Sequence, residues 1–140
     1  MRTDQADPVE REVVDHALER RALLRDVFGG RTTGLDVCDA SPFLKRAARE
    51  LGVRTERTCP ICRRVPLWEA LWVYGDAIGD ASGSSRTPGQ VARLARERPD
   101  FAVYRVEVCL DCGWNHLVRS WRTGTPGTPR ARRARQSDAL

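Results

Sequence analysis

Long apolar runs, lysine and histidine are all scarce in this chain of 140 residues. Its 24 basic residues include only Lys45 as a lysine, and it has two histidines. No apolar run approaches the roughly 20 residues needed to cross a bilayer, and the first residues, MRTDQADPVERE, are too polar and acidic for a secretory signal. We therefore expect a cytoplasmic protein with no membrane association. We interpret the excess of arginine as a coding bias rather than as a sign of phosphate recognition.

The motifs of common enzyme active sites are also missing. The chain has no glycine-rich phosphate loop and no nucleophile elbow. The segment NHLVRS lacks the H-x-E pattern that a zinc deaminase requires. We expect a protein that is not an enzyme and that has no small-molecule substrate.

Acidic residues are outnumbered mainly at the C-terminal end of the chain. The formal net charge is +5, but residues 1–57 carry 11 basic and 11 acidic side chains. Residues 58–122 carry 9 basic and 7 acidic side chains, a surplus that four thiolates around one divalent metal would cancel. Residues 123–140 carry four arginines against Asp138 alone. We predict that residues 123–140 form a disordered basic tail.

Cysteine is scarce too, yet four of the five cysteines fall in two pairs of identical spacing. The pairs are Cys59-Pro-Ile-Cys62 and Cys109-Leu-Asp-Cys112. In a reducing compartment such pairs are typical of metal ligands or redox groups rather than of disulfides. A thioredoxin-like site needs a helix after the pair, and Pro66 disfavours a helix there. We predict that the two pairs form facing knuckles that hold one structural Zn²⁺ through four thiolates.

Alternatives to this zinc site stay open at this point. Iron would use the same four thiolates in a rubredoxin-like electron carrier, although Arg63 and Arg64 do not suit the acidic docking face of such a carrier. His116 can replace a cysteine in a Cys₃His set, but we interpret it as a strand residue because four thiolates already complete the shell. We interpret Cys38 as an apolar packing residue. Gly113 follows the second pair, where a knuckle often needs a positive φ angle.

The apolar periodicity is helical before the first cysteine pair and strand-like after it. Capping patterns and apolar spacing predict helices over about 8–28 and 42–51, which we expect to form a hairpin. Alternating residues predict three strands around the cysteine pairs, and a capping box at Thr87 predicts a short helix between two of them. The strands are expected over 67–74, 101–109 and 114–121. The expected fold class is α+β, with an N-terminal helical region (1–57) followed by a zinc-ribbon domain (58–122) with an antiparallel three-stranded sheet.

Five segments of the chain resemble a small family of uncharacterised actinobacterial proteins. They are GLDVCDASPFLKRAARELG, CPICRR, LWVYGDAIG, SGSSRTP and YRVEVCLDCGWNHLVRSW, and together they span roughly residues 32–122. Members of that family look like zinc-ribbon proteins with a domain of unknown function. The resemblance implies a cytoplasmic actinobacterial protein and implies no particular activity.

Small zinc-ribbon modules mostly serve as docking surfaces. We therefore expect a non-catalytic accessory factor on a nucleic-acid machine, either RNA polymerase or the ribosome. Arginines would supply salt-sensitive contacts to phosphate. The candidates are Arg63, Arg64, Arg119, Arg122, Arg130, Arg132, Arg133 and Arg135.

Two other functions compete with this expectation. One is a protein-binding adaptor without nucleic acid, in which four tryptophans would form an exposed aromatic patch, although their strand positions favour a role in the core. The other is the iron electron carrier described above. The tryptophans are Trp68, Trp72, Trp114 and Trp121.

Overall fold

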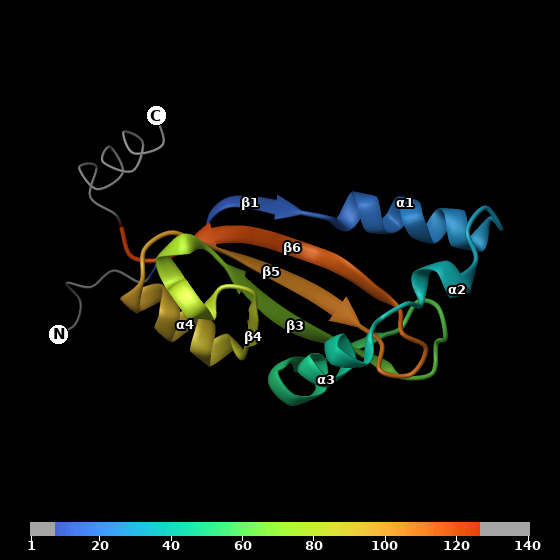
Figure 1. The fold of residues 1–140 in the computed structure, drawn as a ribbon. Helices are drawn as coiled ribbons and strands as arrows, with labels where there is room; N and C mark the ends of the chain where they lie inside the picture. The colour runs from blue at the N-terminus through green and yellow to red at the C-terminus, as the bar shows by residue number, and fades with distance from the viewer. Residues whose placement is uncertain (1–7, 127–140) are drawn as a thin grey trace.

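Six strands form one antiparallel sheet in the computed structural model, which describes residues 8–126 (Figure 1). The sheet order is β1-β6-β5-β3-β2, and β4 pairs with β3 on the same edge as β2. The predicted α+β class is therefore correct, but the predicted number of three strands was wrong. The strands are β1 (Arg11–Asp15), β2 (Val53–Thr58), β3 (Pro66–Tyr74), β4 (Ser84–Arg86), β5 (Phe101–Val108) and β6 (Asn115–Thr123).

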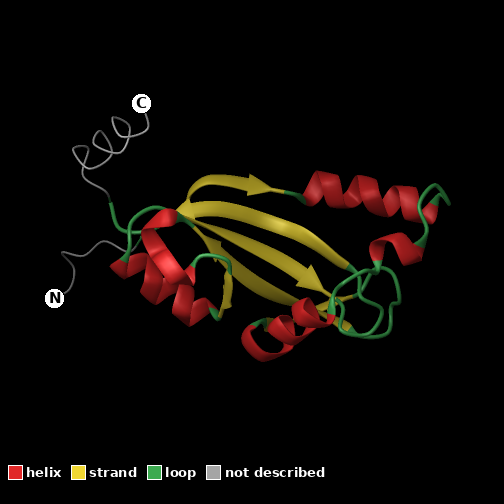
Figure 2. Cartoon of the chain, viewed as in Figure 1, coloured by secondary structure: helices red, strands yellow, loops and turns green. Residues whose placement is uncertain are grey.

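Within residues 8–126, four α-helices and one 3₁₀ helix accompany the sheet (Figure 2). The prediction of a helix after Ser41 is confirmed, because the Ser41 hydroxyl accepts a hydrogen bond from the Leu44 N–H at 3.0 Å. The capping box at Thr87 is confirmed as well, through reciprocal hydrogen bonds with Gln90 of 3.1 and 2.9 Å. The helices are α1 (Ala17–Phe28), α2 (Gly34–Val37), α3 (Pro42–Leu51), η1 (Asp76–Ala81) and α4 (Pro88–Glu97).

The first half of the predicted helix over 8–28 is the strand β1, so that part of the prediction was wrong. β1 pairs antiparallel with β6, whose edge offers backbone N–H and C=O groups that need partners. The side chain of Asp15 then accepts a hydrogen bond from the Ala17 N–H at 2.8 Å. Pairing with a distant strand therefore overrides the local helical pattern, and the helix begins only at Ala17.

The structure does not show the predicted hairpin of two helices. Leu24 of α1 packs against a buried cluster around Trp114 and the cysteines, whereas Ala48 of α3 packs against Ala70 and Val108. Successive side chains of a strand point to opposite faces of the sheet. Because the clusters lie on opposite faces, each helix buries its apolar side on the sheet rather than on the other helix.

The main hydrophobic core lies under α4, at the end of the sheet away from the cysteines. It contains Val73, Phe101, Val103 and Trp121 from the strands, with Val91 from α4 packed on them. Figure 2 shows the loops after β2 and β5 gathered at the other end of the sheet, beside α2 and α3. The core and the cysteine loops thus stabilise opposite ends of the same strands.

The expected boundaries between regions fall within this continuous sheet. β2 ends at Thr58, close to the expected boundary after residue 57, and it pairs with β3 across that boundary. β6 continues to Thr123, and residues 127–140 of the predicted disordered tail lie outside the described residues. Among the helices of residues 8–126, none has the length and apolar character that a bilayer crossing requires.

Candidate metal centre

Four cysteine sulfurs meet at the end of the sheet where β2 and β5 run into their loops. The Sγ atoms of Cys59, Cys62, Cys109 and Cys112 all lie within 4.8 Å of one another. The Sγ atoms of Cys59 and Cys112 are 3.7 Å apart, and those of Cys62 and Cys109 are also 3.7 Å apart. A tetrahedral Zn²⁺ with Zn–S bonds of about 2.3 Å requires sulfurs about 3.8 Å apart. The four thiols that the sequence paired can therefore hold such an ion.

In each cysteine loop, a backbone N–H donates a hydrogen bond to the first sulfur of the pair. The Ile61 N–H donates to the sulfur of Cys59 at 3.4 Å, and the Cys112 N–H donates to the sulfur of Cys109 at 3.3 Å. Hydrogen bonds to sulfur favour its charged form. Each loop is thus a knuckle that turns backbone donors toward the first sulfur of its pair.

A positive φ angle follows the second cysteine of each knuckle. Gly113 has φ +92°, as predicted, and Arg63 has φ +59° at the equivalent position of the first knuckle. At both positions the N–H donates to the carbonyl of the first cysteine, Cys59 or Cys109, at 3.1 Å. A Cβ atom on Gly113 would also lie only 3.0 Å from the carbonyl oxygen of Cys38. Glycine is therefore favoured at 113 for two reasons, its φ angle and this close contact, whereas Arg63 adopts a positive φ angle without being glycine.

The four thiols differ in burial and in pKa. Cys59 and Cys109 are 1% and 0% exposed, whereas Cys62 and Cys112 are partly exposed. Burial raises the pKa of Cys59 and of Cys112 to about 12. Burial acts in the same direction on Cys62, but hydrogen bonds from the Arg64 N–H and from neighbouring sulfurs outweigh it and lower the pKa of Cys62. A divalent cation among the sulfurs would supply the charge that stabilises all four thiolates.

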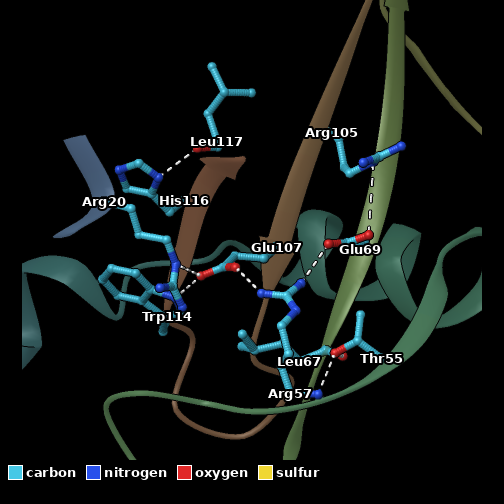
Figure 3. A network of polar contacts seen from close by, with 10 residues as sticks. All are labelled: Arg20, Thr55, Arg57, Leu67, Glu69, Arg105, Glu107, Trp114, His116 and Leu117. Carbon is cyan, nitrogen blue, oxygen red and sulfur yellow. Dashed lines mark hydrogen bonds and ion pairs between the residues drawn. The ribbon is translucent and has the colours of Figure 1, made fainter. Parts of the chain in front are cut away.

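A buried carboxylate lies just before the second knuckle. Glu107 on β5 is 0% exposed, and its carboxylate accepts hydrogen bonds from Trp114 Nε1 at 2.7 Å, Arg20 Nε at 2.7 Å and an Arg57 guanidinium nitrogen at 2.9 Å (Figure 3). Burial by itself would raise the pKa of Glu107, but these three donors hold it below its usual value. Glu107 thereby ties α1, β2 and the second knuckle to β5.

Sequence reasoning missed this carboxylate, because it placed Glu107 on the polar side of a half-buried strand. A signal was available, since alternation along β5 puts Glu107 on the same side of the strand as Cys109. The two arginines that neutralise Glu107 come from elements 87 and 50 residues away in the sequence. No local pattern identifies such partners.

The two candidates for additional ligands take different positions. Cys38 lies beside the site, with its sulfur 3.4 Å from that of Cys112. His116 lies on β6, where its ring stacks on Trp114 with centroids 5.9 Å apart and Nδ1 lies 2.6 Å from the Leu117 carbonyl oxygen. The ligand group found among residues 8–126 consists of the four paired cysteines and does not include His116.

Within residues 8–126, the four arginines predicted to contact nucleic acid already contact other side chains of this protein. Arg63 and Arg64 follow the first cysteine pair, whereas Arg119 and Arg122 lie on β6, and ion pairs reduce the charge that three of the four offer to phosphate. Arg130, Arg132, Arg133 and Arg135 lie outside the described residues. The observed contacts are Arg63 over the ring of Phe28 (5.8 Å), Arg64 with Asp111 (2.8 Å), Arg119 with Glu10 (2.6 Å) and Arg122 with Asp100 (2.9 Å).

A different group of arginines lines a groove along α1. The groove has a volume of about 900 Å³, and no acidic side chain lines it. Arg20 and Arg31 pair with Glu107 and Asp26, whereas Arg21 and Arg25 take no part in the ion pairs found within residues 8–126. The lining residues are Ala17, Arg20, Arg21, Leu24, Arg25, Phe28, Gly29 and Arg31.

The tryptophans do not form one exposed patch. Trp114 and Trp121 are buried at 0% and 6% exposure, as their strand positions favoured, while Trp68 and Trp72 are partly exposed on the opposite face of the sheet. Near Trp72 the sheet carries an uncovered aromatic groove of about 350 Å³. Its lining residues are Trp72, Tyr74, Tyr104, Val106 and Leu117.

Comparisons with known proteins place this chain in a family. A model described as a family of unknown function (DUF5318) matches residues 8–137, and the chain belongs to this family. Proteins of Mycobacterium bovis (strain ATCC BAA-935 / AF2122/97) and Mycobacterium tuberculosis (strain ATCC 25618 / H37Rv), each named only as uncharacterized, are 47% identical to it over 111 residues. The match covers 79% of this chain and 81% of each relative. No solved structure matches the chain. The expected resemblance to an uncharacterised actinobacterial family is thereby confirmed.

Proposed function

We propose that this member of the DUF5318 family binds one structural Zn²⁺ and acts, without catalysis, as a cytoplasmic docking factor on RNA polymerase or the ribosome. The observation that carries the proposal is the meeting of four cysteine sulfurs within 4.8 Å of one another. Cys59, Cys62, Cys109 and Cys112 would hold the ion, whose charge stabilises their thiolates and links the two knuckles.

The donor set supports a structural rather than a catalytic metal. Four thiolates complete the tetrahedral shell of zinc, so no position remains for a reacting water or a substrate. Glu107, a buried acid two residues before Cys109, is 0% exposed and is held by Trp114, Arg20 and Arg57. The centre therefore serves to fix the shape of this end of the sheet.

The arginine groove along α1 supports a nucleic-acid partner. Arg21 and Arg25 are exposed, and the groove that they line contains four arginines and no acidic residue. Contacts of this type to phosphate are sensitive to salt, because binding releases counterions. RNA carried by the ribosome, or nucleic acid bound by RNA polymerase, would supply the phosphates.

The aromatic groove supports a second candidate, a protein-binding adaptor without nucleic acid. No charged side chain lines this groove, and Tyr74 and Tyr104 are 44% and 36% exposed. An apolar segment of another protein suits such a surface, since tyrosine supplies large contact area and a polar hydroxyl. In this candidate the metal would keep its structural role.

Metal analysis of the purified protein tests the first half of the proposal. We expect one zinc per chain and a colourless solution. One iron per chain with the visible absorption of ferric thiolate would instead support the electron carrier. A fully reduced, folded protein with no bound metal would overturn the proposal.

Binding experiments with defined probes test the second half. We expect the protein to co-sediment with ribosomes or to co-elute with RNA polymerase, and to bind mixed-sequence single-stranded RNA in a salt-dependent way. Replacing Arg21 and Arg25 by alanine should reduce the magnitude of the slope of log K against log salt by about 1.4, because each lost phosphate contact contributes about 0.7 to that slope. Alanine at Arg93 and Arg96 of α4, a matched removal of two charges, should leave the slope unchanged. Association that resists nuclease and high salt would favour the protein adaptor.

A further inference from the structure

A fifth cysteine lies in contact with the metal centre. The sulfur of Cys38 is 3.4 Å from that of Cys112, which is closer than the 3.7 Å between Cys112 and Cys59. Four thiolates already complete a tetrahedral shell. Cys38 is thus a spare thiol placed next to one ligand.

Local structure holds Cys38 in this position. Its N–H caps the end of α2 by donating to the Gly34 carbonyl at 2.9 Å, and the preceding Val37 is buried in the cluster that contains the cysteines. Two residues later, the Ala40 N–H donates to the Gly113 carbonyl at 3.0 Å. The segment from α2 to α3 is therefore fastened to the second knuckle on both sides of the spare thiol.

Cys112 is also accessible to a small oxidant. Cys38, Cys62 and Cys112 are partly exposed, whereas Cys59 and Cys109 are buried, and of the partly exposed ligands Cys112 is the one with Cys38 beside it. Ligation of the proposed metal would keep Cys112 as a thiolate, which is the form of cysteine that oxidants attack. A small oxidant can therefore reach a thiolate that has an uncoordinated thiol beside it.

We propose that Cys38 and Cys112 form a hydrogen-peroxide-responsive pair whose oxidation to a disulfide releases the metal. The Cys112 thiolate attacks one oxygen of hydrogen peroxide, the O–O bond breaks, and Cys112 sulfenic acid and hydroxide form. The thiol of Cys38 then attacks the sulfenic sulfur, forming the S–S bond and releasing water. Two thiols lose two electrons in total, and the peroxide receives them.

Loss of the metal follows from the loss of one ligand. A disulfide sulfur is a poor ligand for zinc, so Cys59, Cys62 and Cys109 would hold the ion with one position open. This inference rests on the proposed zinc site. It gives the centre a second role, in which peroxide loosens the knuckles and changes the surface that they shape.

The test uses the full-length, reduced protein and its Cys38→Ser variant, each first analysed for zinc content. Both are then exposed to hydrogen peroxide, zinc release is followed with a chromogenic chelator, and disulfides are mapped by mass spectrometry. We expect both proteins to hold one zinc when reduced. We expect the wild type to form the Cys38–Cys112 disulfide and the variant to release zinc on the order of tenfold more slowly, because it lacks the adjacent trapping thiol. Ala40→Ser, a control that keeps the thiol, should behave as the wild type does.

The outcomes separate this inference from the proposed function. Zinc release at the same rate in both proteins, or disulfides that join only the four ligands, would overturn the role of Cys38 and leave the zinc site intact. Absence of zinc from both reduced proteins would overturn the zinc site and the release step together. Dithiothreitol followed by zinc should restore the metal content of the oxidised wild type, and failure to do so would count against a disulfide.

Discussion

Replacing Glu107 by glutamine tests the claim that a buried carboxylate joins α1, β2 and the second knuckle. The residue is 0% exposed, and both oxygens accept hydrogen bonds, one from Arg57 and the other from Arg20 and Trp114. Glutamine keeps the size of the side chain but removes its charge and one acceptor. The substitution therefore isolates the electrostatic part of the interaction.

The expected loss of stability is about 3 kcal/mol. Two hydrogen bonds from guanidinium groups to a carboxylate become weaker contacts to a neutral amide, which costs roughly 1 kcal/mol each. The amide N–H₂ also faces a guanidinium group with no acceptor, which adds about 1 kcal/mol. The full penalty for breaking a buried ion pair is larger, but Arg20 and Arg57 have side chains 27% and 47% exposed, and water can solvate them again.

Thermal and urea denaturation at saturating zinc measure this loss. For a chain of this length we expect a melting temperature lower by about 10 °C, from roughly 3 °C per kcal/mol. Asp111→Asn is a matched control, because Asp111 also lies two residues from Cys109 but forms an exposed ion pair with Arg64. The control should lose less than about 1 kcal/mol.

Two results would refute the reasoning about Glu107. One is a free energy of unfolding for Glu107→Gln that lies within about 0.5 kcal/mol of the wild-type value, the usual range for surface substitutions. The other is an equal loss in Glu107→Gln and Asp111→Asn, since burial would then make no difference. Zinc content must be the same in all three proteins, because lost metal would itself lower stability.

Three further predictions concern the metal, the second knuckle and the far end of the sheet. Chelation of zinc, or Cys59→Ser, should unfold the cysteine end of the sheet, because a structural zinc contributes on the order of 10 kcal/mol; an unchanged melting curve after complete zinc removal would contradict this. Gly113→Ala should lower the free energy of unfolding by about 2 kcal/mol, because residue 113 has a φ angle of +92° and an added Cβ would contact the Cys38 carbonyl. Urea denaturation measures this loss, and a variant as stable as the wild type would contradict it. Asp100→Asn should cost about 1 kcal/mol at pH 7, because Arg122 lowers the pKa of Asp100. A carboxyl group whose pKa is lowered by folding stabilises the protein above the pKa of the unfolded state, about 3.9, and this stabilisation is lost as pH falls through the pKa of the folded state. The difference in stability between wild type and variant should therefore shrink below about pH 4. A difference that does not depend on pH would exclude the ion pair.

The spare thiol and the buried carboxylate contact different residues at the second knuckle. Cys38 contacts Cys112, the partly exposed cysteine of that knuckle, whereas Glu107 precedes Cys109, the buried cysteine. The proposed oxidation would therefore act on one ligand while the ion pairs of Glu107 keep α1 and β2 joined to β5. This separation would let the knuckle open without loss of the main core, which lies under α4 at the other end of the sheet.

The sequence by itself determined the features that depend on neighbouring residues. The spacing of Cys59, Cys62, Cys109 and Cys112 identified the four cysteines whose sulfurs meet and could hold a metal ion, because a knuckle is a local turn with both sulfurs on one side. The capping signals at Ser41 and Thr87 located α3 and α4 for the same reason, since a cap is satisfied within one helical turn. Apolar alternation likewise located β3, β5 and β6.

Only the tertiary structure decided the features that depend on distant partners. Val13 and Val14 fit a helix as well as a strand, and the open edge of β6 made this segment the strand β1. Glu107 is ionised and buried because Arg20, 87 residues away, reaches it, and Cys38 meets Cys112 across 74 residues. Such contacts depend on the tertiary fold. The free energy of pairing two distant elements depends on both elements, so the sequence pattern of one of them cannot predict it.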